Sequence, residues 1–242
     1  MMHNPLEQFQ INRIGEPITL FGFDVSFSNS ALFMVIAVLS SISLFLLGSR
    51  KREIVPGRFQ SIVEMAYLFG ANLVKENVGS EGRKYFPLIF SLFIFILFCN
   101  LLGMFPYSFT ATSHIIVTFA LALMIFITTT TIGFVKHGRH YFHLLLPSGI
   151  PGWLAPVIVL IELVSYFIRP ISLSIRLAAN MLAGHIILKV IAGFIVGMGA
   201  FGIIPFGFLF LMTGFEIFIA FLHAYIFTLL SCIYLNDAVN MH

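Results

Sequence analysis

Charged residues are scarce in this chain. Only 10% of its 242 residues are Asp, Glu, Lys or Arg, whereas 59% are hydrophobic and the mean hydropathy is +1.02. Soluble domains carry about 25% charged residues. A globular core cannot hide this much apolar surface, so most of the chain must have lipid as its solvent. The sequence therefore predicts an integral membrane protein.

Cysteine is almost absent, and the common catalytic motifs are missing. Cys99 and Cys232 both lie in apolar runs, where we interpret them as buried, inert thiols that form neither a disulfide framework nor a metal site. There is no nucleotide-binding loop and no Ser/His/Asp set with plausible geometry. The segment HGRHYFH at 137–143 is rich in histidine, but it belongs to a basic loop beside a membrane surface and is not expected to bind a metal.

Three apolar runs have the length of a membrane span, which is about 20 residues. They cover residues 31–48, 86–105 and 114–135. Residues 58–79 mix apolar and charged residues at helical spacing, which predicts an amphipathic helix at the membrane interface. Residues 1–30 lack the basic start and short apolar core of a signal peptide. We expect them to form a polar arm before a single transmembrane domain over 31–242.

The C-terminal part is expected to form a long helical hairpin over about 153–235. Its first helix, 153–196, would be roughly 60 Å long, whereas the hydrocarbon core is about 30 Å thick. This helix must either break near Pro170 or tilt strongly. The connector 197–207 separates it from a last helix over 208–235. The fold class is thus an all-α integral membrane protein with five to six helices, one amphipathic and two long, tilted and paired.

Basic residues are concentrated in two loop regions that odd-to-even counting places on one side of the membrane. They are Arg50, Lys51, Arg52, Arg58, Lys75, Arg83, Lys84, Lys136 and Arg139. The opposite side holds only Arg13 and uncharged connectors. The positive-inside rule therefore predicts an outer N-terminus and an inner C-terminus. The net charge of +3 is a topology signal in this context and does not indicate binding to nucleic acid.

The long helices nevertheless contain ionisable residues, each of which costs about 2.5–3.5 kcal/mol on insertion scales. The penultimate helix has Glu162, Arg169, Arg176, His185 and Lys189, and the last helix has Glu216 and His223. At 100° per residue, Glu162, Arg169 and Arg176 share one face within about 40°, and Asn180 extends this stripe. His185 faces the opposite way. Because Glu216 and His223 share a face, these two residues and His185 could assemble into one titratable group.

Structural explanations exist for several of these residues. Glu162 and Arg169 could form an ion pair, and Lys189 could extend to the membrane surface. His185 and Asn180 could be hydrogen-bonding residues between helices. Arg176 is harder to explain in this way, because no acid lies one turn from it on its own helix.

Two kinds of chemistry suit these side chains. Histidine titrates near neutral pH, and strings of histidines and carboxylates at bilayer depth are typical of proton relays. Arginine keeps its charge when desolvated. It can therefore attract a carboxylate and block a proton path, but it does not readily pass protons itself.

The segment ISLSIRLAANMLAGH, 171–185, resembles the signature of subunit a of F-type ATP synthases. The similarity extends through IELVSYFIRP before it, through GFEIFIAFLHAYIF and CIYLNDAVN after it, and to FILFCNLLGMFPYSFTATSHI at 95–115. In that family subunit a is the non-catalytic stator of a membrane motor. It lies against a rotating ring of c subunits, each with an essential carboxylate, and two offset half-channels carry protons to and from the ring to drive ATP synthesis.

The resemblance implies a role for each ionisable position. Arg176 matches the family's essential arginine, whose counterion is expected on the ring, and Asn180 matches its polar neighbour. His185 and Glu216 would line the outer half-channel, and Glu162 would serve the inner one. In one departure from the family pattern, His223 stands where glutamine is typical.

The resemblance also implies partners and a location. The expected partners are the c ring, other stator and peripheral-stalk subunits, the catalytic F1 part indirectly, and membrane lipids; no cofactor is expected, because protons are the transported ion. The order of His185 and Glu216 is the mitochondrial arrangement and predicts the mitochondrial inner membrane, with the plasma membrane of an alphaproteobacterium as the alternative.

Two other functions compete with this interpretation. A self-contained secondary transporter or channel would usually show paired repeats, and none is visible in the sequence. A purely structural membrane subunit would not explain why the ionisable residues of the long helices are retained despite their insertion cost.

Overall fold

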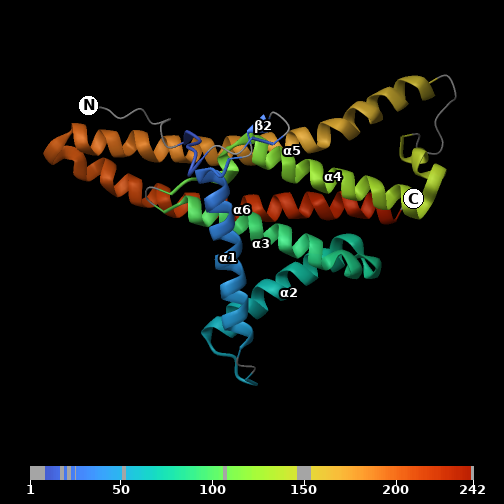
Figure 1. The fold of residues 1–242 in the computed structure, drawn as a ribbon, viewed down its shortest axis with the longest axis horizontal. Helices are drawn as coiled ribbons and strands as arrows, with labels where there is room; N and C mark the ends of the chain where they lie inside the picture. Colours follow the sequence, from blue (N-terminus) through green and yellow to red (C-terminus); the bar gives the residue numbers. More distant parts are fainter. Residues whose placement is uncertain are drawn as a thin grey trace.

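The computed structural model describes residues 9–16, 19–20, 23–24, 26–50, 53–105, 108–145 and 154–240. Its α-helices are α1 (Asn29–Ser49), α2 (Arg58–Val78), α3 (Phe86–Gly103), α4 (Ile115–His137), α5 (Ala155–Gly197) and α6 (Ile203–Val239) (Figure 1). The short 3₁₀ helices are η2 (Ser80–Tyr85), η3 (Ala111–Ser113), η4 (Gly138–Leu145) and η5 (Gly199–Gly202), and the two-residue strands β1 (Thr19–Leu20) and β2 (Phe23–Asp24) pair antiparallel before α1.

The all-α membrane architecture predicted from the sequence is confirmed. Five described helical segments are long and apolar enough to cross a membrane: Asn29–Ser49, Ser80–Gly103, Ile115–Tyr141, Ala155–Gly197 and Ile203–Val239. The predicted amphipathic helix is α2, which exposes Phe59, Ile62, Met65 and Leu68 in its N-terminal half and buries Leu73 and Val74 in its C-terminal half. An apolar exposed face of this kind suits a helix that lies in the membrane interface.

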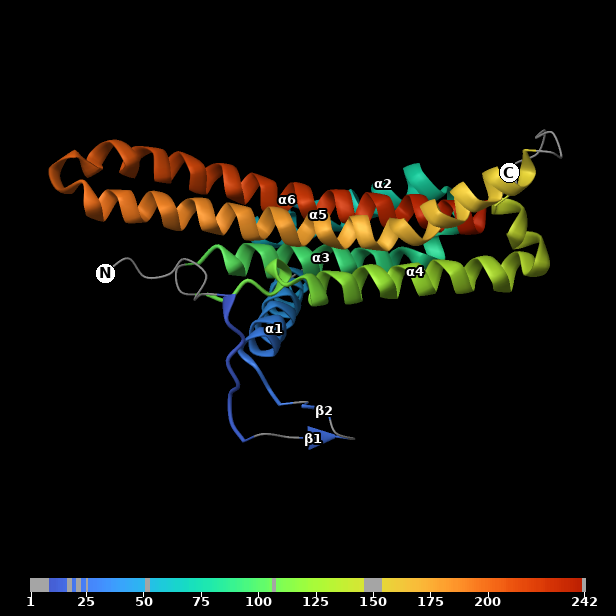
Figure 2. The ribbon, with the colours of Figure 1, turned by 90° about the horizontal axis from the view of Figure 1, so that it is seen from above.

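The long hairpin is formed by α5 and α6, which lie side by side in both ribbon views (Figures 1 and 2). The predicted connector 197–207 is too long, because α6 already begins at Ile203. Pro205 is compatible with this start, since the first four N–H groups of a helix have no intrahelical partner. Gly199 has φ +55°, a backbone conformation that favours glycine, and it makes the tight turn. Trp153, where the hairpin was predicted to begin, lies outside the described residues.

Pro170 does not break α5. The helix runs for 43 residues with this proline inside it, although proline removes one backbone hydrogen bond and crowds the preceding turn. In Figure 1 the N-terminal part of α5 diverges from α6, while the rest follows it closely. The prediction of an unusually long helix therefore holds without a break at the proline.

The core lies where α3, α4, α5 and α6 meet. Ile96, Ile125, Leu177 and Phe227 are all at most 2% exposed there. Asn100 is fully buried among them, and its side-chain amide donates to the carbonyl of Ala220 across 3.0 Å. Small and amide side chains allow close helix packing in lipid, where the hydrophobic effect does not drive association.

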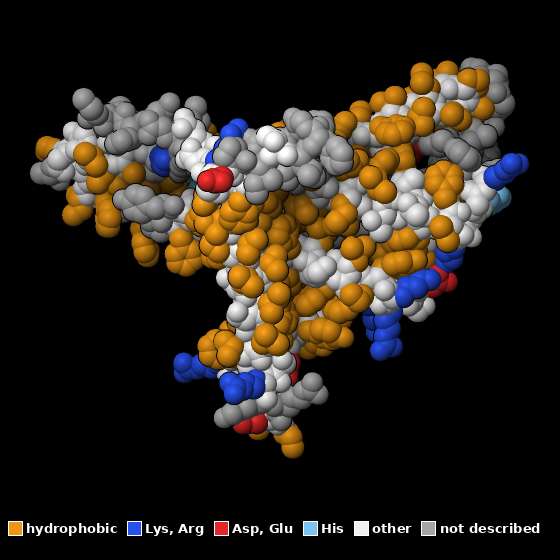
Figure 3. Space-filling view, viewed as in Figure 1, with side chains coloured by type: hydrophobic (Ala, Val, Ile, Leu, Met, Phe, Trp, Pro, Cys, Tyr) orange, Lys and Arg blue, Asp and Glu red, His pale blue; other side chains and the backbone are white. Residues whose placement is uncertain are grey.

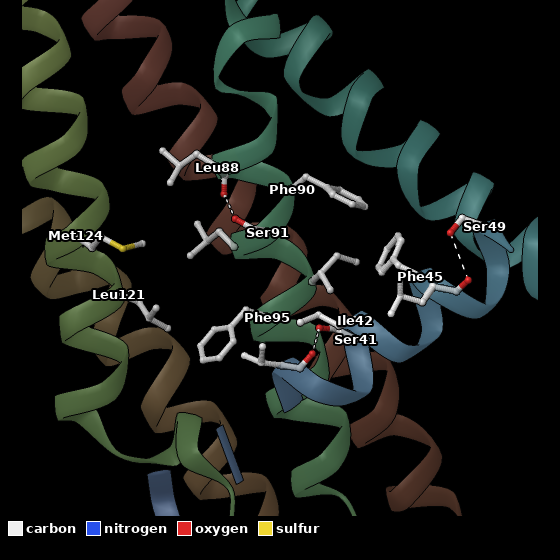
Figure 4. Close-up of a pocket in the computed structure, with 14 residues that line it drawn as sticks. Ser41, Ile42, Phe45, Ser49, Leu88, Phe90, Ser91, Phe95, Leu121 and Met124 are labelled. Carbon is white, nitrogen blue, oxygen red and sulfur yellow. Dashed lines mark hydrogen bonds between the residues drawn. The ribbon is translucent and has the colours of Figure 1, made fainter. Parts of the chain in front are cut away.

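A groove of about 580 Å³ runs between α1, α3 and α4 (Figure 4). Its serines do not make it polar, because the hydroxyl of Ser41 donates to the carbonyl of Val38 and that of Ser91 donates to the carbonyl of Leu88. With these donors satisfied within their own helices, the groove presents mainly apolar groups such as Phe45 and Phe95.

Candidate functional site

His185 of α5 and Glu216 of α6 meet between the two long helices. Nδ1 of His185 lies 3.6 Å from Oε1 of Glu216, and both side chains are less than 10% exposed. Neither carboxylate oxygen of Glu216 has a hydrogen-bond partner among the residues that the structure describes. Gly184 makes room for this carboxylate, because a Cβ at that position would lie 2.6 Å from Oε1. A buried carboxylate without donors is costly, and such groups mark functional positions in membranes.

A third member of this group comes from the connection between α3 and α4. The hydroxyl of Thr110 lies 2.9 Å from Nε2 of His185, and Thr110 is only 4% exposed. Gly103 lets this loop close onto α3, since a Cβ there would lie 2.6 Å from Oγ1 of Thr110. We call Thr110, His185 and Glu216 the His–Glu site. Thr110 was missed from the sequence, because a loop residue has no helical periodicity to place it.

His223 does not join the His–Glu site. Its Nε2 instead contacts the side-chain amide of Asn180, which belongs to the arginine stripe of α5. The predicted titratable group of three therefore contains only two of its members, His185 and Glu216. The register between α5 and α6, which the periodicity of one helix cannot reveal, decides this outcome.

Arg176 points away from the core. It is exposed on α5, and it forms no ion pair or hydrogen bond within the part of the chain that the structure describes. Ser172, Ala179 and Ala183 are exposed on the same face. Small residues allow another helix to approach closely. This face combines an unneutralised cation with room for a partner helix.

A second cluster lies toward the N-terminal end of α5. Arg169 contacts Glu162 at 3.6 Å (Nη2–Oε1) and Asp237 of α6 at 3.0 Å (Nη1–Oδ2). The guanidinium also lies over the rings of Tyr166 and Tyr234. The pair of Glu162 and Arg169 considered from the sequence is therefore present. We call Glu162, Arg169 and Asp237 the arginine-bridged site.

Asp237 was missed from the sequence because it lies on the other helix, near its end. The phenol of Tyr166 extends the polar cluster, with its oxygen 2.5 Å from Oγ1 of Thr130 and 3.1 Å from the phenol of Tyr141. Polar groups of α4, α5 and α6 thus converge at this end of the hairpin.

The two sites are far apart, and Arg176 lies between them in the sequence. Glu162 and His185 are 23 residues apart on α5, which corresponds to about 35 Å along a helix. A cavity of about 150 Å³ lies beside Glu216 and is also lined by Asn180, Ala183 and Gly184. Its lining thus includes Glu216 of the His–Glu site together with Asn180 and Ala183, which are exposed on the face that carries Arg176.

The chain matches the protein family described as ATP synthase A chain over residues 31–236. It is 54% identical over 241 residues to ATP synthase subunit a of Wolbachia sp. subsp. Drosophila simulans (strain wRi), and the alignment covers 99% of this chain and 100% of the relative. Both matches include the whole of α5, with Arg176 and the residues of the two sites on it. The chain therefore belongs to the ATP synthase A chain family.

Proposed function

We propose that this chain conducts protons as the non-catalytic stator subunit of an ATP synthase membrane motor. One observation carries the proposal: Arg176 is exposed and unneutralised on a face of small residues, between two polar sites on the same helix, of which the His–Glu site is buried. A permanent charge in lipid requires a partner. Nothing in the described chain supplies one, so we assign that role to the carboxylates of a rotating c ring.

The two sites then act as the inner ends of two half-channels. A proton passes from Thr110 to His185 and then to Glu216, and water in the adjacent cavity carries it to a ring carboxylate. The neutral carboxylate can face lipid as the ring turns. It releases its proton near Glu162, whose carboxylate is paired with the guanidinium of Arg169. A potential of 100 mV contributes about 2.3 kcal/mol per proton.

Arg176 keeps the two paths separate. Its guanidinium does not lose its proton on desolvation, so it does not relay protons. Its positive charge repels a proton that would pass directly from one site to the other, and it draws the proton off each ring carboxylate that reaches it. No cofactor takes part in this scheme, since every step moves a proton between this chain, water and the ring.

We propose the plasma membrane of an alphaproteobacterium as the location. The order of His185 and Glu216 predicted the mitochondrial inner membrane, but the 54% identical relative is bacterial, and this favours the alternative. The distribution of basic residues supports an outer N-terminus and an inner C-terminus. The other expected partners are peripheral-stalk subunits and, through them, the F1 part.

The test uses the assembled complex with Arg176→Ala in membrane vesicles. Measurements of ATP-driven pumping and passive proton permeability should show that pumping is lost and that a leak appears. Arg169→Ala is the matched control for removal of an arginine from the same helix, and it should not open a leak. If Arg176→Ala vesicles pump at a normal rate, the separator role is wrong and Arg176 serves only the structure.

A further inference from the structure

A hollow of about 650 Å³ lies outside both sites, between the C-terminal half of α2, η2 and the start of α3. One end of the hollow is polar, with Lys75, Ser80 and Arg83. None of its lining residues is acidic. The proposed proton path uses none of these residues, so the hollow needs a separate explanation.

The two cations of the hollow have no protein partner in the described part of the chain. Lys75 and Arg83 are exposed and form no ion pair or hydrogen bond there through their side chains. The carboxylate of Glu81 is engaged elsewhere, because it pairs with Lys136 at the end of α4. The hollow is therefore positively charged and has no internal counterion.

The rest of the lining of the hollow is mainly apolar. The rings of Tyr67 and Phe86 meet edge to face with their centroids 5.0 Å apart, and Pro87 continues this surface along α3. A small inorganic anion would leave that wall uncovered. A ligand that fits both ends has a negative headgroup attached to a hydrocarbon chain.

The position of α2 places the hollow at headgroup depth. The exposed apolar side chains of this helix require contact with lipid, while its charged residues require water, so α2 lies along the membrane interface. Figure 3 shows Lys and Arg side chains at the free lower end of α1 and along the right-hand edge of the molecule, with apolar surface between these two groups, and further ones at the upper left. Lys75 and Arg83 of the hollow are among the basic residues that the sequence assigns to one side of the membrane.

We propose that the hollow binds one anionic phospholipid of the leaflet on the basic side. Its phosphate contacts Lys75 and Arg83, and one acyl chain lies against Tyr67, Phe86 and Pro87. Basic pockets between membrane helices bind such headgroups. The lipid would brace the corner between α2 and α3, behind which Leu73, Val78 and Val239 form a buried cluster that joins α2 to α6.

The test uses the purified complex in nanodiscs of phosphatidylcholine. Native mass spectrometry counts the phosphatidylglycerol molecules bound to the complex, and spin-labelled phosphatidylglycerol reports their affinity. Lys75→Gln with Arg83→Gln should weaken the tightest site by roughly 30-fold, at about fivefold per cation near the surface. The matched control is Arg50→Gln with Arg58→Gln, which removes the same charge from another exposed basic region. This control should leave the affinity of the tightest phosphatidylglycerol site unchanged.

Ala71→Trp tests the apolar wall, because it fills the hollow and keeps both cations. This variant should displace the phospholipid. The proposal is overturned if both charge variants lose lipid equally, if phosphatidylcholine binds as tightly as phosphatidylglycerol, or if the lipid survives Ala71→Trp. It is also overturned if inorganic phosphate competes fully, which would indicate a free anion, or if a protein segment of the complex occupies the hollow. The outcome does not depend on proton conduction, which is measured separately in membrane vesicles.

Discussion

Replacing Thr110 by valine would remove one hydroxyl from the His–Glu site and keep the size and branching of the side chain. That hydroxyl lies 2.9 Å from Nε2 of His185, and the two residues are 4% and 8% exposed. Water therefore has little access to replace it. A buried polar group left without its partner costs about 1–3 kcal/mol.

This cost sets the size of the expected effect. If proton transfer through His185 limits the motor, 1–3 kcal/mol corresponds to pumping that is about five- to 150-fold slower. The assay is ATP-driven acidification of inverted membrane vesicles, followed with a pH-sensitive dye and normalised to the amount of assembled complex. Thr110→Ser retains the hydroxyl and should pump within a few-fold of the wild type.

Thr118→Val is the control for loss of a buried hydroxyl. Thr118 is fully buried, but its hydroxyl donates to the carbonyl of Ile115, 3.1 Å away in its own helix. The Thr118→Val complex should therefore pump at the wild-type rate. A Thr110→Val complex that assembles and pumps at the wild-type rate would refute the relay. Equal slowing by serine and valine at position 110 would do the same, because it would indicate a packing effect.

Three further predictions concern other parts of the molecule. Gly133→Ala should destabilise the chain by about 1–3 kcal/mol, seen as a lower thermal unfolding temperature, because a Cβ there would overlap the ring of Tyr141. Asp237→Asn should slow pumping several-fold in the vesicle assay. Without the carboxylate of Asp237, the positive charge of Arg169 interacts with Glu162 as its one remaining carboxylate partner in the described chain. Burial lowers the pKa of His114 below its usual value near 6.5, so folding favours the neutral ring. The stability due to that ring is present above about pH 6.5 and is lost as the pH falls below it, and unfolding measured against pH should show a shallower acid slope in His114→Gln.

Each of these predictions has its own control. Gly193→Ala meets no atom within 4 Å of the new Cβ, so equal destabilisation by both alanines would contradict the packing explanation. Asp237→Glu keeps the charge and should retain pumping, whereas wild-type pumping by Asp237→Asn would reduce the bridge to a structural contact. An unchanged acid slope in His114→Gln would show that other groups set the pH dependence.

Sequence patterns were sufficient for the membrane-spanning helices α1, α3 and α4 and for the opposite faces of Arg176 and His185. Apolar length placed α1, α3 and α4 within two residues of their observed ends, because a span must match the thickness of the bilayer. The 100° rotation per residue correctly put Arg176 and His185 on opposite faces of α5, one exposed and one buried. These are properties of single helices.

What the patterns missed depends on contacts between segments far apart in the chain. Thr110 meets His185 across 75 positions, and Arg169 meets Asp237 across 68. The axial offset of α5 against α6 decides whether His223 contacts Asn180 or His185 of α5, and no periodicity within either helix encodes that offset. The start of α6 was also missed, since Pro205 suggests an interruption where it only occupies the first turn.

The end of α6 has a consequence for how the molecule is made. Its C-terminal end is held by segments that come much earlier in the chain, because the amide of Asn240 donates to the carbonyl of Val78 and His137 contacts the carbonyl of Val239. A ribosome releases α2 and α4 long before residues 239 and 240 exist. The surfaces of α2 and α4 that contact this end therefore stay without their partner in the bilayer until α6 has been made.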